Sequence, residues 1–214
     1  MHSLIKNSFE KGRLIIFLGA GASYTSKTQK GERIPLGEEL AQILSAEIGL
    51  AYSGESLGDV YDAAKYKLGD IQLNDVFIKN FKNTRPSEDY KKLVNLPFTR
   101  IYSLNIDDCI ERAFSSVVSH DSSRTLETYR NNDPVREIDQ FFQRIDLIKL
   151  NGDILYPKEG FIFSEQEYAT GSTKEPLWYS ELARDFTRYT IVFIGTKLNE
   201  KDNQHNNTIS LRGI

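Results

Sequence analysis

Residues 13–23 read RLIIFLGAGAS, and this stretch decides the fold class. Its first part, 13–18, is apolar on both faces, which is typical of a central parallel strand covered by helices. The run ends abruptly in the small residues Gly19, Ala20, Gly21, Ala22 and Ser23. A strand, a Gly-x-Gly turn and a following helix present backbone N–H groups to an anion, so the motif predicts a phosphate-binding turn. A merely tight turn is the alternative, because Tyr24 stands where the dinucleotide fingerprint has its third glycine.

The composition describes a soluble globular protein. The chain has 214 residues, of which 39% are apolar and 27% are charged, so it can bury one main core. A formal net charge of −3 gives no general attraction to nucleic acid, and no such partner is expected. The single cysteine, Cys109, excludes an internal disulfide and a cysteine-based zinc site, and no metal is expected. Because no signal peptide or run of about 18 apolar residues is found, we expect a cytoplasmic protein without membrane contact.

The rest of the chain alternates between helical and extended patterns. Apolar residues at helical spacing predict helices at 3–11, 35–49, 57–68, 71–82, 87–95 and 175–186. Apolar, β-branched runs predict further strands at 99–105, 145–150, 160–163 and 189–195, with an edge strand at 126–130. This alternation predicts an α/β, Rossmann-like fold with a mostly parallel central sheet and helices on both faces.

The domain organisation follows from the same patterns. Residues 35–96 carry no strand signal, which predicts a helical sub-module inserted after the first strand. Residues 1–200 then form one domain. Residues 201–214 have no periodicity and are expected to be a flexible tail.

Three later strands also end in small or polar residues. They lie in the segments YSLNIDD (102–108), IKLNGD (148–153) and FIGTK (193–197). Because parallel strands end at one common edge of a sheet, these residues and the glycine turn should line one pocket. Structural alternatives remain open for each segment. Asn105 or Asp107 can cap the helix that carries Cys109, and Asn151-Gly152 can form a turn.

The combination of these motifs resembles the sirtuin family. Gly19 to Ser23 is similar to its glycine motif, Asn105-Ile106-Asp107 to its Asn-Ile-Asp motif, and Gly195-Thr196 with Leu198 to its Gly-Thr-Ser-Leu segment. The closest resemblance is to bacterial sirtuin-like domains that act as antiphage-defence effectors and cleave NAD. The resemblance implies that the backbone of Gly19, Ala20, Gly21 and Ala22, with Ser23, binds the pyrophosphate of NAD.

The resemblance also implies roles for the later motifs. Asn105 and Asp107 would face the nicotinamide riboside, while Gly195 and Thr196 would lie near the phosphates or the adenosine ribose. Lys197 replaces the serine of the family segment and would meet a phosphate as a point charge.

Asn151 departs from the family pattern, since Leu150-Asn151-Gly152 occupies the place of a Leu-His-Gly segment that carries the catalytic histidine. Asparagine can hold a ribose hydroxyl, but it cannot accept its proton. General-base catalysis is worth about 10²–10⁴-fold, so turnover at least two orders of magnitude slower than with histidine is expected. None of the histidines, at positions 2, 120 and 205, offers an obvious substitute.

The sequence therefore predicts the NAD-binding domain of a sirtuin-like NAD glycohydrolase, which converts NAD to nicotinamide and ADP-ribose. Its catalytic residues would be Asn105, Asn151 and Asp107, with activity impaired by Asn151. A non-catalytic sensor of NAD or ADP-ribose is the alternative. A protein deacylase ranks third, because the chain lacks the Cys-x-x-Cys zinc module. The resemblance further implies a sensor domain or partner protein outside this chain, and it leaves assembly into a homo-oligomer open.

Overall fold

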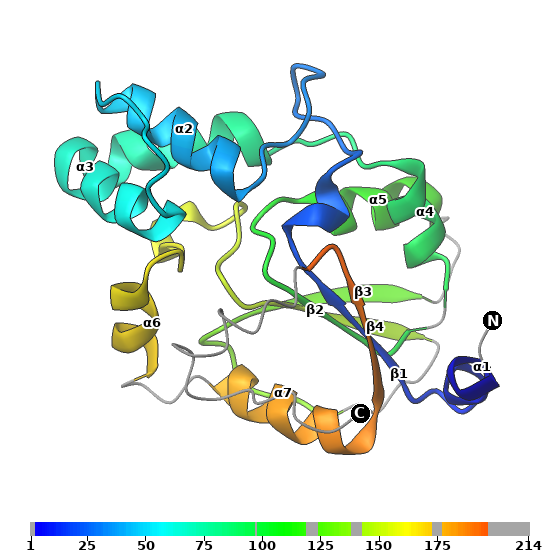
Figure 1. Cartoon of the computed structure of the whole chain (residues 1–214). Coiled ribbons are helices and arrows are strands. Elements are labelled where there is room, and N and C mark those ends of the chain that lie inside the picture. The colour runs from blue at the N-terminus through cyan, green and yellow to red at the C-terminus, as the bar shows by residue number, and fades with distance from the viewer. Residues whose placement is uncertain (1–2, 97, 119–123, 138–142, 173–176, 197–214) are drawn as a thin grey trace.

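The core of the protein is a five-stranded sheet in which every strand pairing is parallel (Figure 1). The computed structural model describes residues 3–96, 98–118, 124–137, 143–172 and 177–196. The strands are β1 (Leu14–Leu18), β2 (Arg100–Ser103), β3 (Thr125–Arg130), β4 (Arg144–Lys149) and β5 (Thr190–Ile194), in the order β3-β4-β2-β1-β5. This is the α/β, Rossmann-like fold that the strand and helix patterns predict.

Seven α-helices and two short 3₁₀ turns are found in the described residues. The helices are α1 (Ser3–Glu10), α2 (Gly37–Glu47), α3 (Leu57–Phe81), α4 (Glu88–Val94), α5 (Cys109–Val117), α6 (Glu165–Ser172) and α7 (Leu177–Arg188). The 3₁₀ turns are η1 (Ala20–Ser23) and η2 (Pro157–Glu159).

The two faces of the sheet are covered by different helices, as predicted. Along β1, Leu14, Ile16 and Leu18 belong to the large core beneath α2–α5, whereas Ile15 and Phe17 pack toward Trp178 and Leu182 of α7. Figure 1 shows α7 on one face of the sheet and α5 on the other. Each fully buried Leu, Ile or Phe contributes about 1.5–3 kcal/mol, so the double-sided apolar run of β1 anchors both layers.

The helical region after the first strand divides into two parts. Helices α2 and α3 pack side by side beyond the sheet, while α4 packs against α5 (Figure 1). The predicted break near Gly69 is present, because Gly69 has φ +70° inside α3 and separates two helical runs. Leu44 of α2 and Phe77 of α3 share one core cluster with Ile16 of the sheet, so these helices have no separate core.

One local expectation was wrong, and one helix was not predicted. Residues 160–163 form no strand, because Phe161 and Phe163 instead pack their rings against Phe77 of α3. Helix α6 was not predicted, since its sequence EQEYATGS has little apolar periodicity. The glycine turn leads into the four-residue η1, and the next α-helix begins at Gly37, inside the predicted helix at 35–49.

Several sequence-based expectations lie outside the described residues. These are Lys197, the tail at 201–214 and the three histidines at positions 2, 120 and 205. Within the described ranges, none of the helices combines the length and the apolar character needed to cross a membrane.

Candidate functional site

The carboxyl ends of the strands place the predicted site residues along one edge of the sheet. Leu18, Ser103, Lys149 and Ile194 are the last residues of four neighbouring strands, and the register aligns them. The glycine turn, Asn105, Asn151 and Thr196 follow these residues within a few positions, so the topology gathers all of them at this edge.

The glycine turn packs tightly against the end of β5. A Cβ atom on Gly19 would lie 2.6 Å from Thr196 Cγ2, and one on Gly21 would lie 2.9 Å from the Gly195 carbonyl oxygen. Gly195 itself has φ +70°, and a Cβ there would lie 2.0 Å from the Ala22 nitrogen. The two glycines of GAGAS are therefore required by backbone approach within the chain, which is the physical basis of the tight-turn alternative.

The backbone N–H groups of the turn are partly occupied by this packing. Gly19 N donates to the Ile194 carbonyl at 3.0 Å, Gly21 N donates to the Gly195 carbonyl at 2.9 Å, and Ala22 N donates to the Gly19 carbonyl at 2.9 Å. Ala20 and Gly21 are nevertheless exposed at the surface of the turn. The outer side of the turn is thus the part that a ligand can reach.

Ser23, Asn105 and Asp107 form a buried polar cluster beneath the turn. The Ser23 hydroxyl donates to Asp107 Oδ2 at 2.7 Å, and Asn105 Nδ2 donates to Ser23 Oγ at 3.1 Å and to the Gly19 carbonyl at 3.0 Å. The three side chains are 1%, 9% and 4% exposed. These contacts link two motifs that lie more than 80 positions apart in the sequence.

Tyr90 of α4 completes this cluster and was missed from the sequence. Asn105 Nδ2 lies 3.4 Å from the Tyr90 hydroxyl, which lies 2.9 Å from Ser23 Oγ. Because Ser23 donates its one proton to Asp107, Tyr90 donates to Ser23, and the hydrogen bonds of Tyr90 and Ser23 run toward the carboxylate. Burial and the nearby Asp107 charge raise the pKa of Tyr90 well above its ordinary value, so the phenol keeps that proton.

Asp107 also bonds the first backbone nitrogen of α5, although the N-cap residue of this helix is Asp108, whose side chain makes no capping hydrogen bond. Asp107 Oδ1 accepts a hydrogen bond from the Cys109 nitrogen at 3.0 Å, whereas Asn105 makes no contact of this kind. Both carboxylate oxygens of Asp107 are therefore held in place. Cys109 is fully buried, and burial raises the pKa of its thiol, so it is a small packed side chain and no nucleophile.

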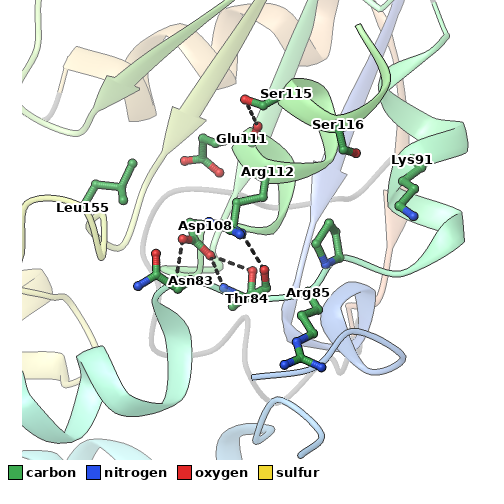
Figure 2. A pocket seen from close by; sticks show the side chains of 11 residues that line it. Asn83, Thr84, Arg85, Lys91, Asp108, Glu111, Arg112, Ser115, Ser116 and Leu155 are labelled. Atoms are coloured by element: carbon green, nitrogen blue, oxygen red, sulfur yellow. Dashed lines mark hydrogen bonds between the residues drawn. The ribbon is translucent and has the colours of Figure 1, made fainter. Parts of the chain in front are cut away.

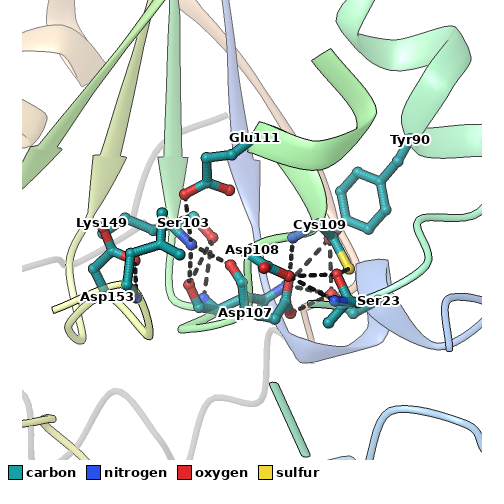
Figure 3. Close-up of polar contacts among 12 residues, drawn as sticks. Ser23, Tyr90, Ser103, Asp107, Asp108, Cys109, Glu111, Lys149 and Asp153 are labelled. Atoms are coloured by element: carbon teal, nitrogen blue, oxygen red, sulfur yellow. Dashed lines mark hydrogen bonds and ion pairs between the residues drawn. The ribbon is translucent and has the colours of Figure 1, made fainter. Parts of the chain in front are cut away.

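A buried ion pair lies on the other side of the same loop. Figure 3 shows Lys149 and Glu111 pointing toward each other behind the segment that carries Asp107. Lys149 Nζ lies 3.3 Å from Glu111 Oε1 and donates to the Asp107 carbonyl oxygen. Burial raises the pKa of Glu111 to about 7 against the opposing charge of Lys149. For Lys149, the carboxylates of Glu111, Asp107 and Asp153 outweigh burial, and its pKa is raised.

Asn151 stands at this edge but contacts a different set of side chains. Its Oδ1 accepts hydrogen bonds from Tyr168 of α6 at 3.1 Å and from Tyr179 of α7 at 3.5 Å. Its side-chain contacts therefore differ from those of Ser23 and Asn105. The predicted turn is present, since Gly152 has φ +106° and a Cβ there would meet the Gly160 carbonyl at 2.7 Å.

A separate open pocket of about 620 Å³ lies next to the loop that carries Asp107 (Figure 2). It is lined by Asn83, Thr84, Arg85, Pro86, Lys91, Asp108, Glu111, Arg112, Ser115, Ser116 and Leu155. Asp108 is held there by hydrogen bonds from the backbone nitrogens of Asn83 and Thr84 at 2.7 and 2.9 Å. The residues predicted to bind a dinucleotide are not among those lining this pocket, so it is distinct from the predicted site.

The donor set gives no indication of a metal centre. Among the residues that the structure describes, no three His, Cys, Asp or Glu side chains gather as metal ligands. Asp107 instead accepts hydrogen bonds, and Glu111 pairs with a lysine.

Comparison with known proteins adds one finding to this geometry. The family model for the SIR2-like domain matches residues 99–208, which is just over half of the 214-residue chain. The matched part contains Asn105, Asp107, Asn151 and the Gly195-Thr196 pair, but it excludes the glycine turn. No curated protein shows a significant similarity to this chain. The sheet topology, the polar carboxyl edge and this match agree, and the chain belongs to the family of SIR2-like domains.

Proposed function

We propose that this domain binds NAD at the carboxyl edge of its sheet, and that its reaction class is the hydrolysis of NAD to nicotinamide and ADP-ribose. The observation that carries the proposal is the hydrogen-bonded cluster of Ser23, Asn105 and Asp107 in a SIR2-like domain. Asn105 and Asp107 are its proposed catalytic residues, together with Asn151.

The residues at this edge fit a dinucleotide. Ala20, Gly21 and Gly195 are exposed at the rim, where the small size of these residues lets a pyrophosphate approach. Beneath them lie the buried polar side chains of Ser23 and Asn105. The proposed binding residues are Gly19, Ala20, Gly21, Ala22, Ser23, Asn105, Asp107, Gly195, Thr196 and Lys197.

When bound, NAD supplies a glycosidic bond whose cleavage develops positive charge on the ribose. The Asp107 carboxylate is fixed by Ser23 Oγ and the Cys109 nitrogen, so it provides a preorganised negative charge for that state. Asn105 is held by the Gly19 carbonyl and Ser23, which sets the direction of its amide. Both side chains act by orientation and electrostatics, without moving far.

Asn151 limits the rate in this proposal. Its Oδ1 accepts from Tyr168 and Tyr179, so the amide NH₂ is the group turned away from the two tyrosines. An amide NH₂ can donate to a ribose hydroxyl, but it cannot take a proton from it. The site therefore lacks the general base that a histidine would supply, and turnover is slow.

The test replaces Asn151 with His and measures nicotinamide release from NAD. We expect a gain of about 10²-fold or more over the wild type, because general-base catalysis is typically worth about 10²–10⁴-fold. Asn151→Ala is the matched control and should show no gain. Calorimetric titration with NAD checks that all three proteins still bind. No gain with histidine, although NAD is bound, would contradict the proposed catalytic role of this position.

A sensor of NAD or ADP-ribose is the second candidate. The observation that favours it is the double tyrosine contact of Asn151, which holds a non-basic side chain in one orientation at the catalytic position. Binding of either nucleotide with no cleavage by the wild type or by Asn151→His would favour the sensor.

The biological setting is proposed from the resemblance of the motifs. In this setting, residues 1–200 are a cytoplasmic antiviral effector that acts without metal or nucleic acid. A sensor domain or partner protein controls its activity. Bacteria expressing the wild type or Asn151→His would be infected with phage, and their NAD content followed. Protection with loss of NAD, stronger in the histidine variant, supports this setting, and unchanged NAD during infection argues against it.

A further inference from the structure

Lys149 is a buried cation in an unusual place. It is the last residue of β4, it is 1% exposed, and it follows the apolar pair Leu147-Ile148 of that strand. Taking an ammonium group out of water costs several kcal/mol unless charge and hydrogen bonds compensate it. The groups that compensate the buried charge of Lys149 therefore indicate its structural role.

The ammonium group of Lys149 faces three oxygen atoms, one from α5 and two from the loop that follows β2. Nζ lies 3.3 Å from Glu111 Oε1 of α5 and 3.5 Å from the Asn105 carbonyl oxygen, and it donates to the Asp107 carbonyl oxygen. The contact with Glu111 is an ion pair, and the hydrogen bonds of the ammonium group go to the two backbone carbonyls. Figure 3 shows Lys149 and Glu111 converging on the loop from the side opposite Ser23.

These contacts fix the loop at 104–108 on the side away from Ser23. The carbonyl groups of Asn105 and Asp107 are directed to Lys149, while their side chains are directed to Gly19 and Ser23. Fixing two carbonyls of one short segment removes the rotations about the backbone that would turn those side chains away. The lysine thus acts on both proposed NAD-facing residues without touching the ligand side.

We propose that Lys149, held by Glu111, is a positioning residue that orients Asn105 and Asp107 for the nucleotide. This inference rests on the proposed function for the identity of the ligand, but not for the orientation of the loop. It assigns a role to a residue that lies behind the site, and it explains why a charged side chain is kept at this buried position.

The test compares four proteins: the wild type, Lys149→Met, Lys149→Met/Glu111→Gln and Arg100→Met. Methionine keeps the apolar stem and removes the donors. The double variant removes both charges, so it folds even where an unpaired buried Glu111 prevents Lys149→Met from folding. Arg100→Met is the matched control, because Arg100 is also a 1% exposed, ion-paired cation, but it lies at the opposite edge of the sheet.

Two measurements are made below the melting temperature of every variant. The first is hydrogen–deuterium exchange of residues 104–109, where the amides of Asn105, Asp108 and Cys109 are hydrogen-bonded. The second is calorimetric affinity for ADP-ribose and NAD. We expect both Lys149 variants to exchange this segment at least 10-fold faster and to bind at least 10-fold more weakly, with Arg100→Met unchanged in both.

The possible outcomes separate the two proposals. Unchanged exchange in the Lys149 variants overturns the positioning role, whether or not affinity falls. Equal acceleration in Arg100→Met also overturns it, because the effect would then be general destabilisation. If the wild type binds neither nucleotide while the segment responds to Lys149 alone, the positioning role stands and the proposed function fails.

Discussion

The two edges of the sheet each bury one cation, and the two cations have different partners. Arg100 begins β2 at the amino edge, where its guanidinium lies 2.7 Å from Asp185, 3.4 Å from Glu181 and 3.8 Å from Asp146. Lys149 ends β4 at the carboxyl edge and binds one carboxylate and two backbone carbonyls.

The different partners give the two charges different roles. Arg100 joins helix α7 to the sheet, whereas Lys149 fixes the loop after β2. Asp185 and Glu181 lie on α7, so Arg100 ties that helix to the sheet, and Tyr102 adds a hydrogen bond to Asp185 at 2.7 Å. Lys149 instead binds the backbone carbonyls of Asn105 and Asp107, whose side chains belong to the polar cluster at the carboxyl edge. Loss of the first charge should cost mainly stability, whereas loss of the second should cost mainly the order of one segment.

The largest effect is expected at the amino edge. Asp185→Ala leaves Arg100 and Tyr102 without their shared partner in a buried site, and we expect the free energy of unfolding to fall by about 3–5 kcal/mol. Urea denaturation measures this loss. Arg184→Ala is the control, since its ion pair with Glu181 is exposed at the arginine and should change stability by less than about 1 kcal/mol. Similar losses in both variants would contradict the layer-joining role of Arg100.

An intermediate loss of stability is expected at the carboxyl edge, where the backbone of Gly195 packs against that of the glycine turn. Gly195→Ala combines a positive φ with a Cβ 2.0 Å from the Ala22 nitrogen, and we expect a loss of about 2–4 kcal/mol. Gly49→Ala is matched in backbone conformation, with φ +69° and nothing within 4 Å of the added Cβ. It should cost only about 1 kcal/mol. Thermal unfolding of both variants measures the difference in stability. Equal losses would show that neighbouring backbone shifts to accommodate the added Cβ at position 195.

A smaller effect is expected from the protonation of Glu111. Because its pKa is raised to about 7, the folded protein keeps a proton between about pH 4.5 and pH 7 that the unfolded chain loses. Stability therefore falls as the pH rises through this window, by up to about 3.5 kcal/mol, since one pKa unit is worth about 1.4 kcal/mol. Urea unfolding of the wild type and Glu111→Gln at pH 4.5 and 7.5 tests this. An identical pH dependence in the two proteins would exclude Glu111 as its source.

Much of the fold was predictable because its central strands are apolar on both faces. The run at 13–18 predicts a doubly covered strand, and the structure assigns its alternate side chains to two cores. The segment at 160–163 has a similar composition but forms no strand, since its aromatic rings fill space against α3. Apolar content indicates burial, but a short run does not say which element buries it.

The candidate site was predictable only in part, for a similar reason. Ser23, Asn105 and Asp107 were predicted because each follows a strand, and parallel strands end together. Tyr90 lies on a helix remote in sequence, and no local pattern indicates its contact with Ser23. Tyr179 resembles an ordinary packing residue on α7, yet it contacts Asn151. For Lys149, a lysine between Ile148 and Leu150 at the end of a buried strand was an available signal.

The sequence by itself determined the five strands of the sheet, most of the helices, the double-sided apolar core and the set of polar residues at the strand ends. These depend on periodicity and on local steric rules, which neighbouring residues express directly. Only the tertiary structure decided that the glycine turn meets Gly195, that Tyr90 donates toward Asp107, and that Lys149 holds the loop from behind. Such contacts join residues far apart in the chain, and their geometry is set by packing, which no local pattern records.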